Sequence, residues 1–104
     1  MTATQAQFEV RSPFSGQVVG VVPDQGTAEA KEMADRSVKA FASWRKTTAY
    51  ERAALLRKFY DLMLRDEAEI AHMIASEMGK PITEATGEVK YAAAFIDWYA
   101  EEAK

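Results

Sequence analysis

The sequence predicts an α+β fold that is mainly helical, with an N-terminal β-hairpin followed by three or four amphipathic helices. Within residues 8–23, apolar residues alternate on both sides of a Pro-Phe-Ser-Gly turn, which is typical of two paired strands. From residue 27 onward, apolar residues recur at intervals of three and four, the period of an α-helix. The 104 residues allow one domain, and residues 1–7 are expected to be a disordered N-terminus because they are small and polar.

The turn of the predicted hairpin contains one proline and one glycine. Pro13 presets φ for the second position of a turn, and Gly16 can adopt the positive φ that closes it. Residues 17–22 then include four valines before Pro23 ends the strand. Because a two-stranded hairpin is only marginally stable in water, we expect its apolar face to lie on another part of the protein.

The helical layer is expected to span residues 27–104. Thr27 is the expected N-cap of its first helix, which runs to about Trp44. The apolar residues of this helix share one face, and they are Ala30, Met33, Ala34, Val38, Phe41 and Ala42.

Local signals also mark the later helices. Thr48 and Glu51 have the spacing of a reciprocal capping box and predict the start of a second helical segment. The periodicity leaves open whether residues 48–78 form one bent helix or two. Gly79 before Lys80-Pro81 predicts a helix end, and a last helix is expected from about Ile82. Residues 101–104 carry no cap signal, so we expect the natural chain to continue.

The composition excludes several classes of function. A formal net charge of −3 opposes the positive surface that nucleic acids require, so no nucleic-acid partner is expected. The absence of cysteine excludes disulfides, thiolate metal sites and a cysteine nucleophile within this chain. No segment approaches the roughly 20 apolar residues of a membrane span, so no membrane association is expected and the cytoplasm is the default location.

Two patterns of titratable residues are weak candidates for chemistry. Glu69 and His72 have the Glu-x-x-His spacing of di-iron bundles, but His72 is the only histidine, and a solvated helix face is the favoured interpretation. Glu84 and Glu88 lie one helical turn apart and are likewise expected on a solvated face. No residue of this chain is predicted to be catalytic, and none is predicted to bind a cofactor.

Large apolar residues at positions 95–99 cover more than one side of the last helix. A helix that is apolar on more than one side requires neighbours on more than one side. We favour packing over ligand stacking as the role of the helical aromatic residues. The chain has few helices of its own to supply these neighbours.

Several ordered motifs resemble the N-terminal stretch of aldehyde dehydrogenases. They are Ser12-Pro13-Phe14-Ser15-Gly16-Gln17-Val18-Val19, Val22-Pro23, Ala40-Phe41-Ala42-Ser43-Trp44-Arg45, Glu51-Arg52-Ala53-Ala54-Leu55-Leu56 and Glu77-Met78-Gly79-Lys80-Pro81. Residues 84–89 and 95–104 are similar to the succinate-semialdehyde dehydrogenase branch. The resemblance covers residues 8–104, as a hairpin (8–23) and a helical layer (27–104) within the α/β fold of that family.

The resemblance implies a parent enzyme of several hundred residues that oxidises an aldehyde, succinate semialdehyde by the branch, to a carboxylic acid with NAD or NADP. The family's cysteine nucleophile, glutamate base and Rossmann-type cofactor site all lie outside this segment. This chain alone is therefore expected to be inactive and to bind no cofactor. Its expected partners are the rest of the aldehyde dehydrogenase chain and other subunits.

Two features of the family map onto residues of this chain by resemblance. Glu77 matches a carboxylate near a structural monovalent cation, with the backbone carbonyl near Val10 as a second ligand. Tyr91 and Phe95 lie on the helix that borders the substrate entrance in the family. The alternatives are a solvated helix-end glutamate for Glu77 and simple packing for the two aromatic residues.

A second hypothesis concerns binding instead of catalysis. In it, the chain is a stand-alone helical interaction module, derived from such an enzyme, that associates with a protein partner or with itself. Its support in the sequence is the excess of apolar helix faces.

Overall fold

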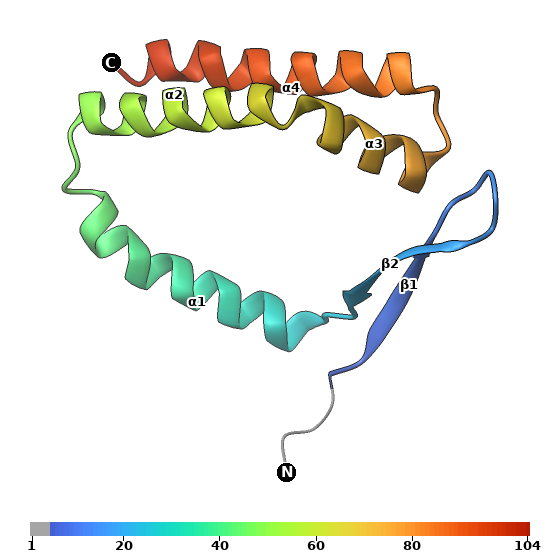
Figure 1. Cartoon of the computed structure of the whole chain (residues 1–104). Helices are drawn as coiled ribbons and strands as arrows, with labels where there is room; N and C mark the ends of the chain where they lie inside the picture. Colours follow the sequence, from blue (N-terminus) through green and yellow to red (C-terminus); the bar gives the residue numbers. More distant parts are fainter. Residues whose placement is uncertain (1–4) are drawn as a thin grey trace.

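The computed structural model describes residues 5–104 and consists of a two-stranded hairpin followed by four helices (Figure 1). This architecture confirms the predicted mainly helical α+β class. The elements are β1 (Gln7–Arg11), β2 (Val18–Pro23), α1 (Thr27–Trp44), α2 (Ala49–Arg65), α3 (Glu67–Met78) and α4 (Ile82–Glu102).

Strands β1 and β2 are antiparallel, with Gln7 opposite Pro23 and a register shift after Val10. The first strand begins at Gln7, so the segment expected to be disordered overlaps it by one residue, while residues 1–4 lie outside the described part. Gly16 has a φ of +74°, as the turn requires, and its N–H donates to the Ser12 carbonyl at 2.8 Å.

Glutamate carboxylates near the starts of α1 and α2 accept hydrogen bonds from backbone N–H groups that have no partner within the helix. The predicted capping box of α2 is confirmed: the Glu51 N–H donates to Thr48 Oγ1 at 3.1 Å, and the Thr48 N–H donates to Glu51 Oε2 at 2.6 Å. The prediction for α1 was wrong by one residue, because Gly26 is the N-cap and Thr27 is already helical. Glu29 accepts the Gly26 N–H at 2.9 Å, which favours the earlier start.

Acidification is expected to weaken the starts of α1 and α2. The hydrogen bond from the Thr48 backbone lowers the pKa of Glu51, and the bond from the Gly26 backbone lowers the pKa of Glu29. A carboxyl whose pKa is lower in the folded state stabilises fully above its unfolded pKa, about 4.3, and loses this effect as the pH falls through the folded pKa. Circular dichroism of thermal unfolding between pH 7 and pH 3 tests this. In the Glu51→Gln variant, the unfolding temperature should fall less steeply as the pH is lowered from 7 to 3. If this fall is unchanged in both Glu29→Gln and Glu51→Gln, the assignment is contradicted.

Residues 48–78 form two helices, which answers the question that the periodicity left open. Asp66 separates them with φ −99° and ψ 14°, and it ends α2 and begins α3. The side chain of Arg65 pairs with Asp66 through Nε and Nη2, both at 2.8 Å. In Figure 1, α4 runs back along α2 and α3, and α3 bends away from the line of α2.

The core lies between α4 and the α2–α3 pair and consists largely of small side chains. Its centre is formed by Ala71, Ala85 and Val89, with Ile70, Ile74 and Ala75 packed around it. The other buried apolar residues are Ala53, Ala93 and Ala100. Alanine methyl groups let the helix backbones approach closely.

Helix α1 lies apart from this layer (Figure 1). None of its residues is buried, and it makes no extensive contact with another described element. The molecule is thin, with principal extents of 47 × 44 × 19 Å. No helix within residues 5–104 is long and apolar enough to cross a membrane.

Candidate functional site

The outer side of α4 carries an aromatic surface formed by Tyr91, Phe95, Trp98 and Tyr99. These residues surround a shallow hollow on the side of the helix opposite the buried residues that pack on α2 and α3. The rings of Tyr91 and Phe95 meet edge to face, with centroids 5.0 Å apart and an interplanar angle of 89°. The structure therefore brings together the two residues expected at the substrate entrance.

Trp98 belongs to the same surface, although packing was the role favoured for the aromatic residues of the helices. Positions 91, 95 and 98 are four and three residues apart, so the side chain of Trp98 shares one face of α4 with those of Tyr91 and Phe95. The surface offers an apolar wall and phenol hydroxyls but no carboxylate, amine or thiol. It can line a passage for a small molecule, whereas bond-making chemistry would have to come from other residues.

Glu77 lies exposed in the last turn of α3. It lines a surface hollow together with Val19 of β2, His72, Met73 and Ser76. Val10 is on the adjacent strand, paired with Gly20. Thus Glu77 lies next to the hairpin, on the side of β2.

The oxygen donors of Glu77 and Val10 are of the type that hard cations prefer. Two such donors do not complete a coordination shell. Residues 5–104 contain no group of three or more His, Cys, Asp or Glu side chains arranged to hold a metal ion.

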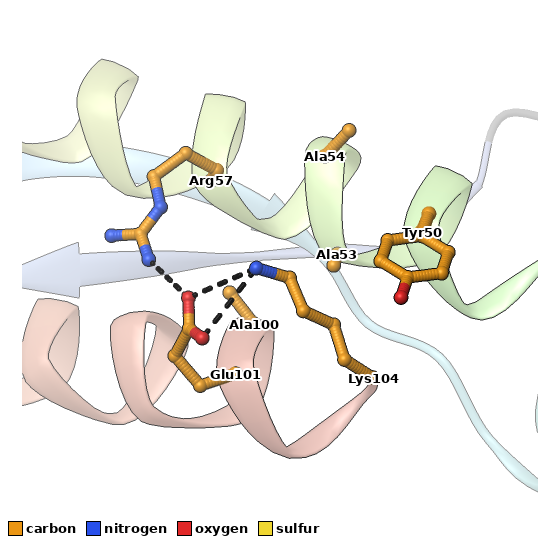
Figure 2. A pocket seen from close by; sticks show the side chains of 7 residues that line it. All are labelled: Tyr50, Ala53, Ala54, Arg57, Ala100, Glu101 and Lys104. Atoms are coloured by element: carbon orange, nitrogen blue, oxygen red, sulfur yellow. Dashed lines mark hydrogen bonds and ion pairs between the residues drawn. The ribbon is translucent and has the colours of Figure 1, made fainter.

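An ion-pair cluster holds α2 to α4 at the end of the layer. Figure 2 shows the side chain of Arg57 beside Glu101, with Lys104 reaching the same carboxylate. Arg57 pairs with Asp97 and with Glu101, the latter at 3.1 Å, and the Lys104 ammonium lies 3.4 Å from Glu101. The hydrogen bond that Arg57 donates to the Asp97 carboxylate raises the pKa of Arg57 above its usual range, so the guanidinium stays charged. The cluster links α2 to the helix that carries the aromatic surface.

Replacing Arg57 with alanine is expected to lower the stability by a small amount. At high salt, this difference between the variant and the parent should become smaller still. Both ion pairs are partly exposed, and such pairs are weak and screened. Thermal unfolding in low salt and in about 1 M NaCl measures the effect. Arg65→Ala is the matched control, since within residues 5–104 Arg65 pairs with its sequence neighbour Asp66 and not with α4. Equal effects of the two variants at both salt concentrations would contradict a specific role of Arg57 between the helices.

The aldehyde dehydrogenase family model matches residues 1–104, which is the whole chain. The chain belongs to the aldehyde dehydrogenase family. It is 46% identical to the glutarate-semialdehyde dehydrogenase of Pseudomonas putida over 97 residues, which are 93% of this chain and 20% of that relative. It is 45% identical to the mitochondrial succinate-semialdehyde dehydrogenase of Rattus norvegicus over 101 residues, 97% of this chain and 19% of that relative.

Solved structures of aldehyde dehydrogenases have the same fold over this segment. The succinate-semialdehyde dehydrogenase of Burkholderia pseudomallei superposes with a TM-score of 0.90 at 45% identity, over 93% of this chain and 20% of that one. A Bacillus halodurans glyceraldehyde-3-phosphate dehydrogenase complexed with NADP gives 0.88 at 28% identity, over 93% of this chain and 20% of that one. This aldehyde dehydrogenase segment thus spans about one-fifth of the length of the relatives it matches.

The remaining titratable candidates of this aldehyde dehydrogenase segment lie on its surface. Glu88 is ion-paired with Lys80, and its helical neighbour Glu84 is exposed. Glu69 and His72 are both exposed on α3. These positions agree with the solvated helix faces favoured for both pairs.

Proposed function

We propose that this chain is the N-terminal portion of an NAD(P)-dependent aldehyde dehydrogenase that oxidises a short semialdehyde, succinate semialdehyde in the first instance, to the dicarboxylic acid. The observation that carries the proposal is the identity of 43–46% to succinate- and glutarate-semialdehyde dehydrogenases over 93–97% of the chain. The agreement of fold with the Burkholderia enzyme supports it.

The chain alone is proposed to be inactive and to bind no cofactor. The nucleophile of aldehyde dehydrogenases is a cysteine thiolate, and this chain contains no cysteine. NAD or NADP would accept the hydride when bound to the rest of the enzyme. The contribution of this segment is to support the body that holds these groups and to border the path to it.

Tyr91 and Phe95 are proposed to border the substrate entrance. Their edge-to-face contact gives a stiff apolar wall suited to the methylene groups of a semialdehyde. The wall carries no cation, so a partner for the substrate carboxylate would come from another part of the enzyme. The Glu77 carboxylate and the Val10 carbonyl are proposed as two of the ligands of a structural monovalent cation.

The alternative, a stand-alone helical interaction module, uses the same exposed apolar faces. Such faces are expected both in a part of a larger enzyme and in a separate binding module, so they do not favour the module. The cytoplasmic location expected from the sequence also stays a prediction.

A full-length chimera tests the proposed function. In the Pseudomonas putida glutarate-semialdehyde dehydrogenase, the matched 97 residues are replaced by those of this chain. We expect the chimera to reduce NAD or NADP with succinate or glutarate semialdehyde at a kcat/KM within about tenfold of the parent, which corresponds to roughly 1.4 kcal/mol in the barrier. The 104-residue chain alone should give no turnover. A folded chimera that assembles like its parent but turns over neither substrate would contradict the proposal.

Replacing Phe95 with alanine in this chimera is expected to lower kcat/KM for succinate semialdehyde roughly two- to tenfold. The change removes the ring that meets Tyr91 edge to face, so this side of the passage no longer positions the substrate. Initial rates against substrate concentration measure it. Phe59→Ala is the control, since Phe59 is also an exposed phenylalanine but lies on α2. Equal losses in both variants would contradict an entrance role for Phe95.

A further inference from the structure

The C-terminal end of α4 is rich in negative charge. Residues 97–104 contain the carboxylates of Asp97, Glu101 and Glu102 but only one cation, the ammonium of Lys104. The C-terminal end of a helix also carries a partial negative charge of its own, so carboxylates there add to a charge of the same sign. The aromatic surface described above lies on this helix and reaches into the same turns.

A semialdehyde with a terminal carboxylate is an anion at neutral pH. Along the aromatic surface it would pass the negative end of α4 within about one helix diameter, roughly 10 Å. At that distance in water, one unit charge changes the local concentration of a monovalent anion about twofold, and the effect is larger between the low-dielectric walls of a cleft. The carboxylates of α4 therefore oppose the approach of such a substrate unless another residue balances their charge.

Arg57 of α2 supplies a balancing charge from outside the helix. Its guanidinium contacts the Asp97 carboxylate through Nη1 and lies 3.1 Å from Glu101 through Nη2. One cation thus pairs with two carboxylates that are one helical turn apart, and Figure 2 shows its side chain reaching toward Glu101. The guanidinium also lies over the ring of Tyr60, with Cζ 5.7 Å from the ring centroid, a contact that favours this position of the charge.

We propose that Arg57 is a specificity-determining residue, which neutralises the acidic end of α4 so that the substrate entrance admits an aldehyde bearing a carboxylate. Arg57 acts through the electrostatic potential at the aromatic surface and does not itself bind the substrate. The inference rests on the proposed function and adds to it the means by which an anionic substrate passes an acidic helix.

Quenching of Trp98 fluorescence measures the potential at the aromatic surface without using activity. Trp98 is 64% exposed, and Trp44→Phe leaves it as the only tryptophan of the chain. Iodide is an anionic quencher and acrylamide a neutral one, so the ratio of their quenching constants reports the local potential. The measurement uses the 104-residue chain at an ionic strength of about 0.02 M, where screening over roughly 10 Å is weak.

The two partners of the ion pair should change this ratio in opposite directions. Arg57→Gln is expected to lower iodide quenching roughly 1.5- to twofold, because it leaves the carboxylates unbalanced, whereas Asp97→Asn should raise it by a similar factor. The double variant should return to the parent ratio, although it has lost the ion pair. Arg36→Gln is the matched control, since it removes the same charge from α1, which lies apart from the layer. A role in packing alone would change both single variants in the same direction.

Kinetics of the chimera with the Pseudomonas putida enzyme extend the test to the substrate. Arg57→Gln should raise KM for succinate semialdehyde about twofold or more at low salt, with kcat unchanged and with KM for the neutral butanal unchanged. Asp97→Asn should lower KM for succinate semialdehyde. Addition of about 0.5 M NaCl should remove both differences, because it screens the charges.

Two results would overturn the proposal. They are iodide quenching that is equal in the parent chain and in both single variants, and KM values for the charged and the neutral aldehyde that change together. A chimera that turns over no aldehyde would contradict the proposed function instead. The quenching ratio in the chain alone would then still decide whether Arg57 sets the potential at the aromatic surface, so the two failures are distinguishable.

Discussion

Replacing Val89 with aspartate is expected to abolish the folded α3–α4 layer. Val89 is 2% exposed and is the largest side chain at the centre of the core, between Ala71 and Ala85. A carboxylate there would lie among apolar side chains, and the effective penalty of burying such a charge is several kcal/mol. Since small domains are stable by only about 5–15 kcal/mol, this loss is enough to unfold the layer. Circular dichroism should show lower helicity at 25 °C and no cooperative thermal transition.

Lys90→Asp is the matched control for this variant. Lys90 is the next residue of α4 and is exposed, so it receives the same new side chain without burial. The control is expected to keep the helicity and the transition of the parent chain. Similar unfolding of both variants would mean that Val89 does not hold the layer together.

Replacing Gly79 with alanine is expected to separate the hairpin turn from the end of α3. Gly79 has a φ of +75°, a conformation that costs other residues roughly 1–2 kcal/mol. A Cβ atom there would also lie 2.8 Å from Pro13 Cγ, well inside van der Waals contact. The clash adds to the backbone cost, so the loss of stability should exceed that of an alanine at an open left-handed position. Chemical denaturation measures it, and hydrogen exchange of the turn amides reports the separation.

Gly16→Ala supplies the open position for comparison. Its φ is +74°, and nothing lies within 4 Å of a Cβ there, so it carries the backbone cost alone. A double-mutant cycle of Gly79→Ala with Pro13→Ala isolates the clash, because removing the proline ring should restore part of the loss. If the effects of the two changes simply add, the contact between Pro13 and Gly79 has no energetic importance.

Local signals predicted most of the elements of this fold. The box of Thr48 and Glu51, the turn at Gly16 and the end at Gly79 each depend on a few neighbouring residues, and the structure has all three. The break at Asp66 was left open, because the apolar stripe is interrupted at Arg65-Asp66 but resumes with helical spacing at Ile70. The start of α1 was misplaced by one residue, since a glycine N-cap has no side chain to mark it.

The contacts between distant residues could not be predicted from the sequence. Arg57 and Asp97 are 40 positions apart, and they meet only because α4 folds back along α2. Tyr91 and Phe95 lie four positions apart, a spacing that places them on one face of a helix, but this spacing does not say which face of α4 is covered by α2 and α3. The separation of α1 from the layer likewise depends on packing that no local pattern encodes.

The alanines between α4 and the α2–α3 pair restrict how this segment can move. Their methyl groups hold the helix backbones close together, so a larger side chain at any of these positions would push α4 away from α2 and α3. The four aromatic residues on the outer side of α4 would shift with it.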